Sequence, residues 1–285
     1  MGMFHRSTRR RFAAVHSMPW RRRGLTLVEL MMVSAVMAIL ASTLAALATT
    51  VQIANQQQMG RGLATQHGQV AIQRIEHALQ GATTSEQFPG FIVVSETVSG
   101  STFPDTLVVW KPSGQPISPD GLPRVNELVV FTPMDEDPTR LIELRNPNDT
   151  SEVPVVANIS GWQNLISIMK TSAVASSDSR AVVLTDLMRM ADVTDPSGKS
   201  FGQRGCVRFE QMLRPSAAEW QAYKAGSASW QSLPWVQGIY GASFGQRQAL
   251  CRIELQLRPG DINSHDKLVA VPFFGSAAIY YQLER

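Results

Sequence analysis

One apolar segment near the N-terminus constrains the fold more than any other feature of the sequence. Leu25–Ala48 is 24 residues long and carries a single charge, on Glu29. A helix needs about 20 apolar residues to cross a bilayer, and a secretory signal has a shorter apolar region of roughly 7–15 residues. A carboxylate inside such a span costs roughly 2.5–3.5 kcal/mol and normally has a partner. The segment therefore predicts a membrane helix in which Glu29 has a function.

The basic residues of the chain are concentrated in front of this segment. Residues 1–24 hold seven arginines and no acidic residue, so the rest of the chain has 19 basic and 23 acidic residues. A basic flank of this kind stays in the cytoplasm, which places the remainder of the chain on the other side of the membrane. The acidic balance of the remainder gives no electrostatic reason to expect nucleic acid as a partner.

The residues at this junction resemble the prepilin signal of type IV pilins and type II secretion pseudopilins. Three arginines precede Gly24, and the sequence continues LTLVEL into the apolar run. The resemblance implies that prepilin peptidase cleaves between Gly24 and Leu25 on the cytoplasmic side and methylates the new amine of Leu25. It also implies a single-pass inner-membrane protein with a periplasmic head, which later enters a pilus or pseudopilus.

The resemblance gives Glu29 a role in assembly. Cleavage would create an ammonium group at Leu25, and staggered helices in a filament would bring Glu29 of one subunit to the ammonium of its neighbour. Both charges are costly in lipid, and their pairing would neutralise them. We therefore expect Glu29 to be an assembly contact. The basic leader, residues 1–24, is long for this class, and a start at Met18 would shorten it to MPWRRRG.

The proline-free stretch after the leader predicts one long helix from Leu25 to Leu79. Residues 25–50 form the membrane and assembly helix, and residues 51–82 are its amphipathic continuation. Gly81 has the position of a helix stop. Gly60 and Gly62 predict a bend or fray, and the helical spacing predicts an apolar stripe along the continuation, formed by Met59, Leu63, Ala71, Ile72, Ile75, Ala78 and Leu79.

Residues 83–285 are predicted to form a β-rich head. The expected fold class is α+β and pilin-like: a long N-terminal helix packed on an antiparallel sheet. Two short helices are expected at 161–169 and 216–225, the second capped by Ser216. Alternating apolar residues, β-branched and aromatic residues predict strands at Phe91–Val98, Thr106–Lys111, Asn126–Thr132, Arg140–Arg145, Val153–Val156, Ala181–Thr185, Cys206–Leu213, Leu250–Leu257 and Ala277–Leu283.

The two cysteines, Cys206 and Cys251, each open a predicted strand. Outside the cytoplasm they could form a disulfide between neighbouring strands, and two free buried thiols are the alternative. The window 214–248 is rich in aromatic residues. Such rings can anchor a partner, but packing of an insertion on the sheet is the favoured interpretation.

No residues of the chain suggest an enzyme, a cofactor or a metal site. "SGKS" at 197–200 lacks the glycine of a phosphate loop, and His67 and His77 do not share a helix face. The acidic turn Asp135–Asp137 lacks the spacing of a calcium loop, so a solvated turn is the favoured interpretation.

Three functions are compatible with the sequence. The first is a minor subunit of a type IV pilus, at the tip or in priming, resembling the W-type. The second is a J-type minor pseudopilin of a type II secretion system, and the third is an unrelated exported module anchored to the membrane. For the first two, the resemblance implies prepilin peptidase, other pilins and an inner-membrane assembly platform as partners.

Overall fold

A computed structural model describes residues 26–98, 100–175, 180–194, 198–237, 242–259 and 270–282. The chain divides into two compact units, residues 1–53 and 54–285. The helices are α1 (Leu27–Gln80), α2 (Ile159–Ala175) and α3 (Ala217–Lys224), with short 3-10 turns at Val125–Glu127 and Trp230–Ser232. The strands are β1 (Phe91–Val98), β2 (Ser101–Trp110), β3 (Leu128–Pro133), β4 (Leu141–Arg145), β5 (Arg180–Thr185), β6 (Met190–Thr194), β7 (Ser200–Gly205), β8 (Val207–Arg214), β9 (Gln246–Leu257) and β10 (Val271–Gln282).

The helix α1 has the extent that the sequence predicts. It ends at Gln80, and the amide of Gly81 closes its last turn on the carbonyl of His77 at 3.3 Å. The predicted fray at Gly60 and Gly62 does not occur, because the helix is uninterrupted through both glycines. A glycine lowers helix stability by about 1 kcal/mol, and the neighbouring turns outweigh that cost here.

The buried stripe of α1 begins later than predicted. Met59 and Leu63 are 74% and 48% exposed, so their assignment to the stripe is wrong. The contact between α1 and the head begins at Ala64, and the buried positions recur at intervals of three and four residues as far as Leu79, namely Ala64, Gly68, Ala71, Ile72, Ile75, Ala78 and Leu79. The second part of α1 is therefore a core element of the head.

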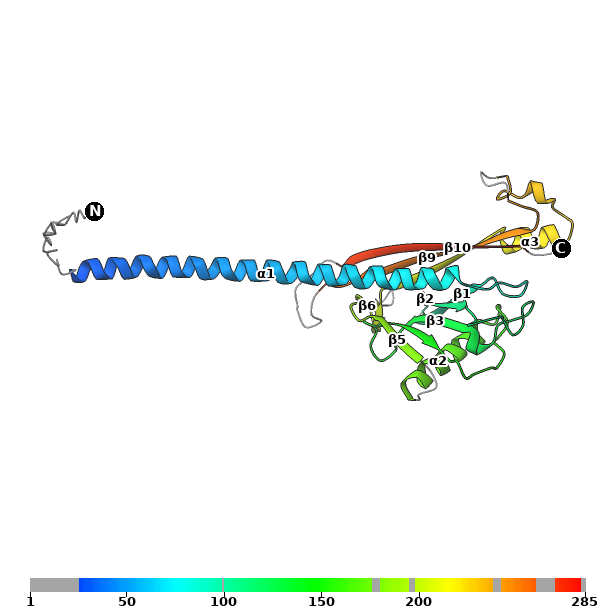
Figure 1. The fold of residues 1–285 in the computed structure, drawn as a ribbon, viewed down its shortest axis with the longest axis horizontal. Helices are drawn as coiled ribbons and strands as arrows, with labels where there is room; N and C mark the ends of the chain where they lie inside the picture. Colours follow the sequence, from blue (N-terminus) through cyan, green and yellow to red (C-terminus); the bar gives the residue numbers. More distant parts are fainter. Residues whose placement is uncertain are drawn as a thin grey trace, which may run out of the picture. The chain divides into compact units, whose positions relative to one another are not determined.

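A five-stranded antiparallel sheet in the order β1-β2-β3-β4-β5 lies between α1 and α2 (Figure 1). It separates two apolar cores. Alternate residues of its strands point to opposite faces. One face packs against α1 through residues such as Phe91, Val109 and Phe131. The other face packs against α2, where Trp162 and Phe88 are fully buried. The α+β, pilin-like fold class is confirmed.

A second sheet, in the order β10-β9-β8, completes the core around α1. Its inner residues join those of α1 and of the first sheet in one cluster. Gly68 allows this close packing, because a Cβ atom there would lie 2.6 Å from the ring of Phe273 and the ring would have to shift. Gly275 has the same role on β10, where a Cβ would lie 2.6 Å from Ile72.

One buried ion pair fixes α1 on the five-stranded sheet. Glu143 of β4 is 2% exposed and accepts hydrogen bonds from Arg74 of α1 at 2.7 and 3.1 Å. Arg145 donates a third bond at 2.8 Å. Burial acts to raise the pKa of Glu143, but the hydrogen bonds from both arginines outweigh it and hold this pKa below its usual value. The buried carboxylate is therefore ionised and fully paired.

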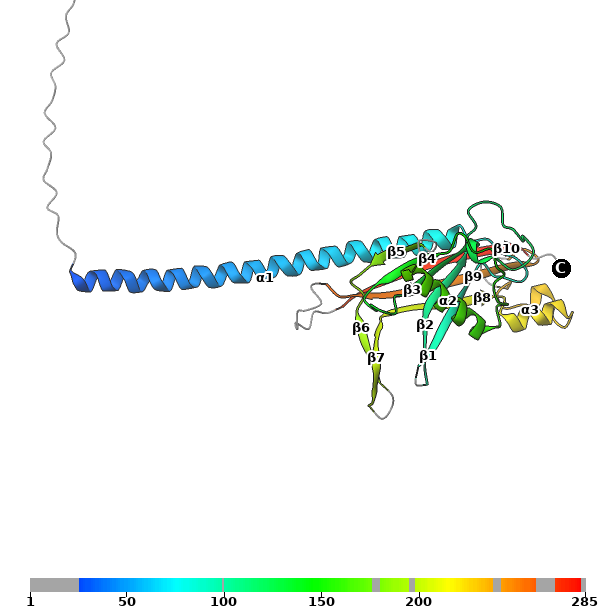
Figure 2. The same cartoon turned by 90° about the horizontal axis from the view of Figure 1, so that it is seen from below.

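The strand predictions are confirmed for most of the head, wrong at one place and incomplete at another. Residues 153–156 form no strand, and a single bridge joins Glu152 to Arg124. Pro154 explains this, because proline removes a ladder hydrogen bond. The hairpin of β6 and β7 was not predicted. Figure 2 shows it beside the hairpin of β1 and β2.

Candidate functional site

The first turn of α1 contains a reciprocal capping pair. The Glu29 carboxylate accepts hydrogen bonds from the Thr26 amide at 2.9 Å and from the Thr26 hydroxyl at 3.1 Å. The Glu29 amide donates to the Thr26 hydroxyl at 3.3 Å. This is a capping box, in which two otherwise unpaired amides at a helix start are satisfied. The residues Thr-x-x-Glu, here Thr26 to Glu29, are the sequence signal for this contact, and the role of Thr26 was not predicted.

Glu29 keeps capacity for a second partner while it caps the helix. Both residues of the pair are exposed, and a carboxylate has about four acceptor positions, of which Thr26 uses two. The predicted partner, the amine of Leu25, lies with Gly24 outside the described residues. An ammonium group from a neighbouring chain could therefore bind Glu29 without displacing the cap.

The rest of this N-terminal part of α1 presents apolar side chains on every side. All described residues up to Ile53 are exposed, among them Leu30, Val36 and Leu44. Within the described part of the chain, α1 is the one helix that is long and apolar enough to cross a membrane. Such a surface is stable in lipid or against other apolar helices.

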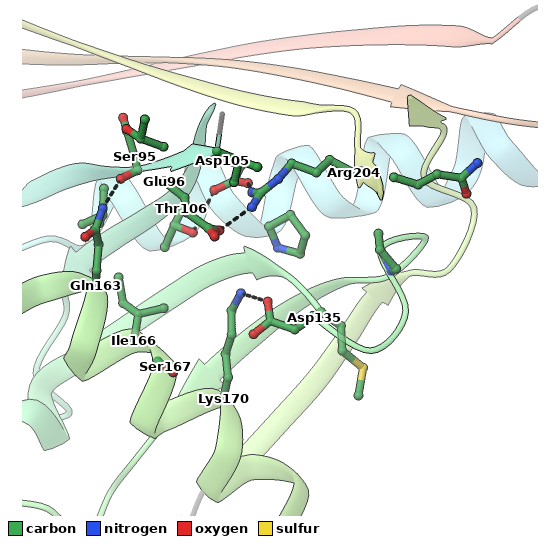
Figure 3. A pocket seen from close by; sticks show the side chains of 18 of the residues that line it. Ser95, Glu96, Asp105, Thr106, Asp135, Gln163, Ile166, Ser167, Lys170 and Arg204 are labelled. Atoms are coloured by element: carbon green, nitrogen blue, oxygen red, sulfur yellow. Dashed lines mark hydrogen bonds and ion pairs between the residues drawn. The ribbon is translucent and has the colours of Figure 1, made fainter. Parts of the chain in front are cut away.

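A cleft in the head, of about 790 Å³, lies between the β1–β2 hairpin, α2 and β7 (Figure 3). Arg204 of β7 lies in its wall and pairs with Glu96 at 2.7 Å and with Asp105 at 3.1 Å. Across the cleft, Lys170 of α2 pairs with Asp135. Burial raises the pKa of Asp105, and the charge of Arg204 opposes that rise. The contacts of Arg204 attach the β6–β7 hairpin to the first sheet, and the Lys170–Asp135 pair joins α2 to the loop after β3.

The two cysteines are both free and do not face each other. Cys251 of β9 lies opposite Gln211 of β8, whereas Cys206 precedes β8 and its carbonyl accepts a hydrogen bond from the Gln256 amide at 2.9 Å. The two cysteines are thus separated by about five strand positions, roughly 16 Å at 3.3 Å per residue. A disulfide requires Cα atoms about 4.4–6.8 Å apart, so of the two alternatives the structure has free thiols, with Cys251 buried and Cys206 half-buried.

The acidic turn at residues 135–137 pairs with neighbouring side chains. Asp137 binds Arg140 at 3.0 Å and the hydroxyl of Thr139, while Asp135 pairs with Lys170. The described residues contain no group of three or more histidine, cysteine or acidic side chains that could hold a metal ion.

The aromatic window forms a small core of its own between β8 and β9. Trp220, Tyr223 and Trp230 are buried together with Leu233, and ring centroids lie 5.2–6.5 Å apart. Ser216 caps α3 as predicted. The guanidinium of Arg247 stacks on Trp220, with its carbon 5.0 Å from the ring centroid. The rings therefore pack mainly on one another, not as a free aromatic surface.

Comparison with known protein families decides how this N-terminus is classified. Residues 21–45 match the family model "Prokaryotic N-terminal methylation motif". This motif, together with the fold, supports a type IV pilin-like protein. No match was found among curated proteins or among solved structures.

The match includes Glu29 and the apolar start of α1. The motif implies that prepilin peptidase processes this pilin-like protein, that its N-terminal helix anchors it to a membrane, and that it assembles with other pilins or pseudopilins. The motif belongs to structural subunits, and it accounts for an apolar segment in which Glu29 is the one charged residue.

Proposed function

We propose that this pilin-like protein is a minor subunit of a type IV pilus, located at the tip or used in priming. The exposed Glu29 at the start of the apolar N-terminal part of α1 is the observation that carries the proposal, together with the methylation motif around it. The large head, residues 54–285, supports a low-copy role. A thin filament with many identical subunits favours a smaller head.

The proposed maturation has two steps on the cytoplasmic side of the inner membrane. Prepilin peptidase cleaves between Gly24 and Leu25 and methylates the new amine. The Leu25 ammonium of one subunit then pairs with Glu29 of its neighbour, while Thr26 continues to cap the helix. Pairing removes the cost of an isolated carboxylate in an apolar setting, about 2.5–3.5 kcal/mol. The inner-membrane assembly platform would receive the cleaved and methylated subunit.

Three variants separate the charge of Glu29 from its capping role. Glu29→Gln keeps a side chain that suits a capping box but has no charge, Glu29→Ala loses both functions, and Thr26→Val removes the hydroxyl. We expect all three to be processed, as mass spectrometry of the N-terminus would show. Glu29→Gln and Glu29→Ala should be absent from sheared filaments, and Thr26→Val should remain in them. Normal incorporation of Glu29→Gln would refute the charge-pairing mechanism.

A minor pseudopilin of a type II secretion system is the alternative, because the same motif occurs in both systems. Deletion of the gene distinguishes the two. Loss of surface filaments with normal protein secretion supports the pilus. Loss of secretion with normal filaments supports the pseudopilus and would overturn the proposal.

A further inference from the structure

Two arginines from different elements converge on the buried Glu143. Arg74 of α1 and Arg145 at the end of β4 both donate to the same atom, Glu143 Oε1, at 3.1 and 2.8 Å. The side chains of Arg74 and Arg145 are 47% and 34% exposed, whereas that of Glu143 is 2% exposed. The carboxylate is therefore at the base of this contact, and both guanidinium groups reach the surface.

Two more basic residues lie at the same end of the five-stranded sheet. Lys111 directly follows β2, and its ammonium donates to the carbonyl of His77 in α1 at 3.3 Å. Because Arg74 precedes His77 by three residues, Lys111 lies about one helical turn away from Arg74. Arg180 begins β5 and lies directly opposite Arg145, so the two side chains share a face of the sheet. Four positive charges thus gather beside the last turns of α1.

This basic cluster, which consists of Arg74, Lys111, Arg145 and Arg180, has more positive than negative charge. Glu143 is the acid within it, and Asp178, two residues before Arg180 in the sequence, lies outside the described residues. With both acids counted, four basic residues meet two acidic ones, a net charge of +2. The carboxylate of Glu127 is engaged elsewhere, because it accepts hydrogen bonds from the Trp110 ring and from two backbone amides.

Like charges within the basic cluster repel one another. Arginines directly opposite each other on neighbouring strands, as Arg145 and Arg180 are, destabilise the pairing. Burial lowers the pKa of Lys111, and the charges of Arg145 and Arg74 lower it further, against a rise caused by Glu143. An anion beside these side chains would relieve both repulsions.

The two arginines keep hydrogen-bond donors for such an anion. Arg145 donates to Glu143 from Nε, and Arg74 donates from Nε and Nη2. A guanidinium group has five N–H donors in a planar fork, so Nη1 of Arg74 and both terminal nitrogens of Arg145 can still donate to a ligand. Planar forks of this kind, together with an ammonium group, suit the oxygens of a phosphate.

We propose that the basic cluster binds a phosphate monoester in its dianionic form. A monoester carries about −1.5 to −2 charges at pH 7 and three strong acceptor oxygens, which matches the net charge of +2 and the three basic elements around it. A phosphodiester, as in nucleic acid or phosphatidylglycerol, has one negative charge per group and would leave a positive charge unmatched. A single carboxylate would leave the same excess. The inference concerns the head alone and does not depend on the proposed function.

A titration of the full-length protein in detergent, followed by phosphorus NMR at constant ionic strength, tests the site. We expect saturable binding of glucose 1-phosphate and a Kd at least about tenfold higher for dimethyl phosphate, which carries one charge. Inorganic phosphate distinguishes two sources: tighter binding of glucose 1-phosphate supports a phosphorylated sugar, and equal binding supports free phosphate. Absence of binding by both, or equal binding of dimethyl phosphate, would overturn the proposal.

Two variants remove a charge from the basic cluster and leave the hydrogen bonds to Glu143 in place. Lys111→Gln and Arg180→Gln should each raise the Kd for glucose 1-phosphate by about tenfold or more, because a charged hydrogen bond is lost. Lys111→Arg keeps the charge and should retain most of the binding. Lys224→Gln is the matched control, since Lys224 pairs with Glu86 elsewhere on the head. An unchanged Kd in both glutamine variants, with thermal unfolding as in wild type, would refute the site.

Competition tests the preference for a monoester over polymeric or membrane-bound diesters. A short DNA duplex and vesicles of phosphatidylglycerol are added to the complex with glucose 1-phosphate, at equal concentrations of phosphate groups. We expect neither to displace the ligand. Displacement by the duplex or by the vesicles, lost in Lys111→Gln, would contradict the proposed monoester and would indicate nucleic acid or a lipid surface as the partner.

Discussion

Replacing Arg74 by methionine should loosen the contact between α1 and the head while keeping most of the apolar stem. Arg74 donates two hydrogen bonds to the buried Glu143. Hydrogen bonds to charged groups contribute about 1.5–3 kcal/mol each, and breaking a buried ion pair costs about 3–5 kcal/mol. Two facts reduce this cost: the Arg74 side chain is 47% exposed, and Arg145 continues to hold Glu143. We expect a loss of about 2 kcal/mol, or roughly 4–8 °C in Tm for a domain of this size.

Thermal unfolding of the detergent-extracted protein, followed by tryptophan fluorescence, measures this loss. The pH dependence adds a second test, because the pKa of Glu143 is held below its usual value. The contribution of this ion pair to the free energy of unfolding is complete at pH values above the pKa of Glu143 in the unfolded chain. It is lost as the pH falls through the lower pKa of Glu143 in the folded protein. The difference in Tm between wild type and Arg74→Met should thus be largest at pH 7 and should shrink below about pH 4.5. Gln73→Met, at an exposed position of the same helix, is the control. Equal Tm values for the two variants would refute the reasoning.

Two further pairs of residues should respond differently to the same treatment: Gly68 and Gly62 to replacement by alanine, and Cys251 and Cys206 to labelling of their thiols. Gly68→Ala should destabilise the head, because overpacking against Phe273 costs about 1–3 kcal/mol and outweighs a helix gain of about 1 kcal/mol; Gly62→Ala, with no atom within 4 Å of its Cβ, should stabilise the helix. Thermal unfolding decides, and a shift of the same sign in both variants would contradict this. Cys251 is fully buried, which raises its pKa to about 12, whereas Cys206 is half-buried. Maleimide should label Cys251 only after denaturation, and equal labelling rates in the native protein would disprove its burial.

The local sequence pattern predicts the parts of the fold that depend on neighbouring residues. The length of α1 follows from an apolar run, a proline-free stretch and Gly81. The capping of α3 by Ser216 follows from a serine before a helical pattern. Strands such as β3 and β9 follow from alternating β-branched and apolar residues. These elements carry their signal within a few residues, so one sequence suffices to predict them.

The parts that the sequence did not predict depend on contacts between distant residues. The hairpin of β6 and β7 is rich in polar residues and glycine, and Arg204 attaches it to Asp105, 99 residues away. The bond from Arg74 to Glu143 spans 69 residues. The exposed edge of β5 follows from the order of five strands, which no single strand reveals. Thr26 is the exception, because its capping signal with Glu29 is present in the sequence.

The buried stripe of α1 has a consequence for any proteolytic release of the head from the membrane. A fragment that starts at Ala54 keeps all seven buried positions of α1, whereas one that starts at residue 83 loses them and exposes the inner faces of both sheets to water. A protease that sheds an intact, soluble head must therefore cut before Ala64, within the exposed turns that follow Ile53. Cleavage nearer the head would yield an aggregating fragment instead of a secreted one.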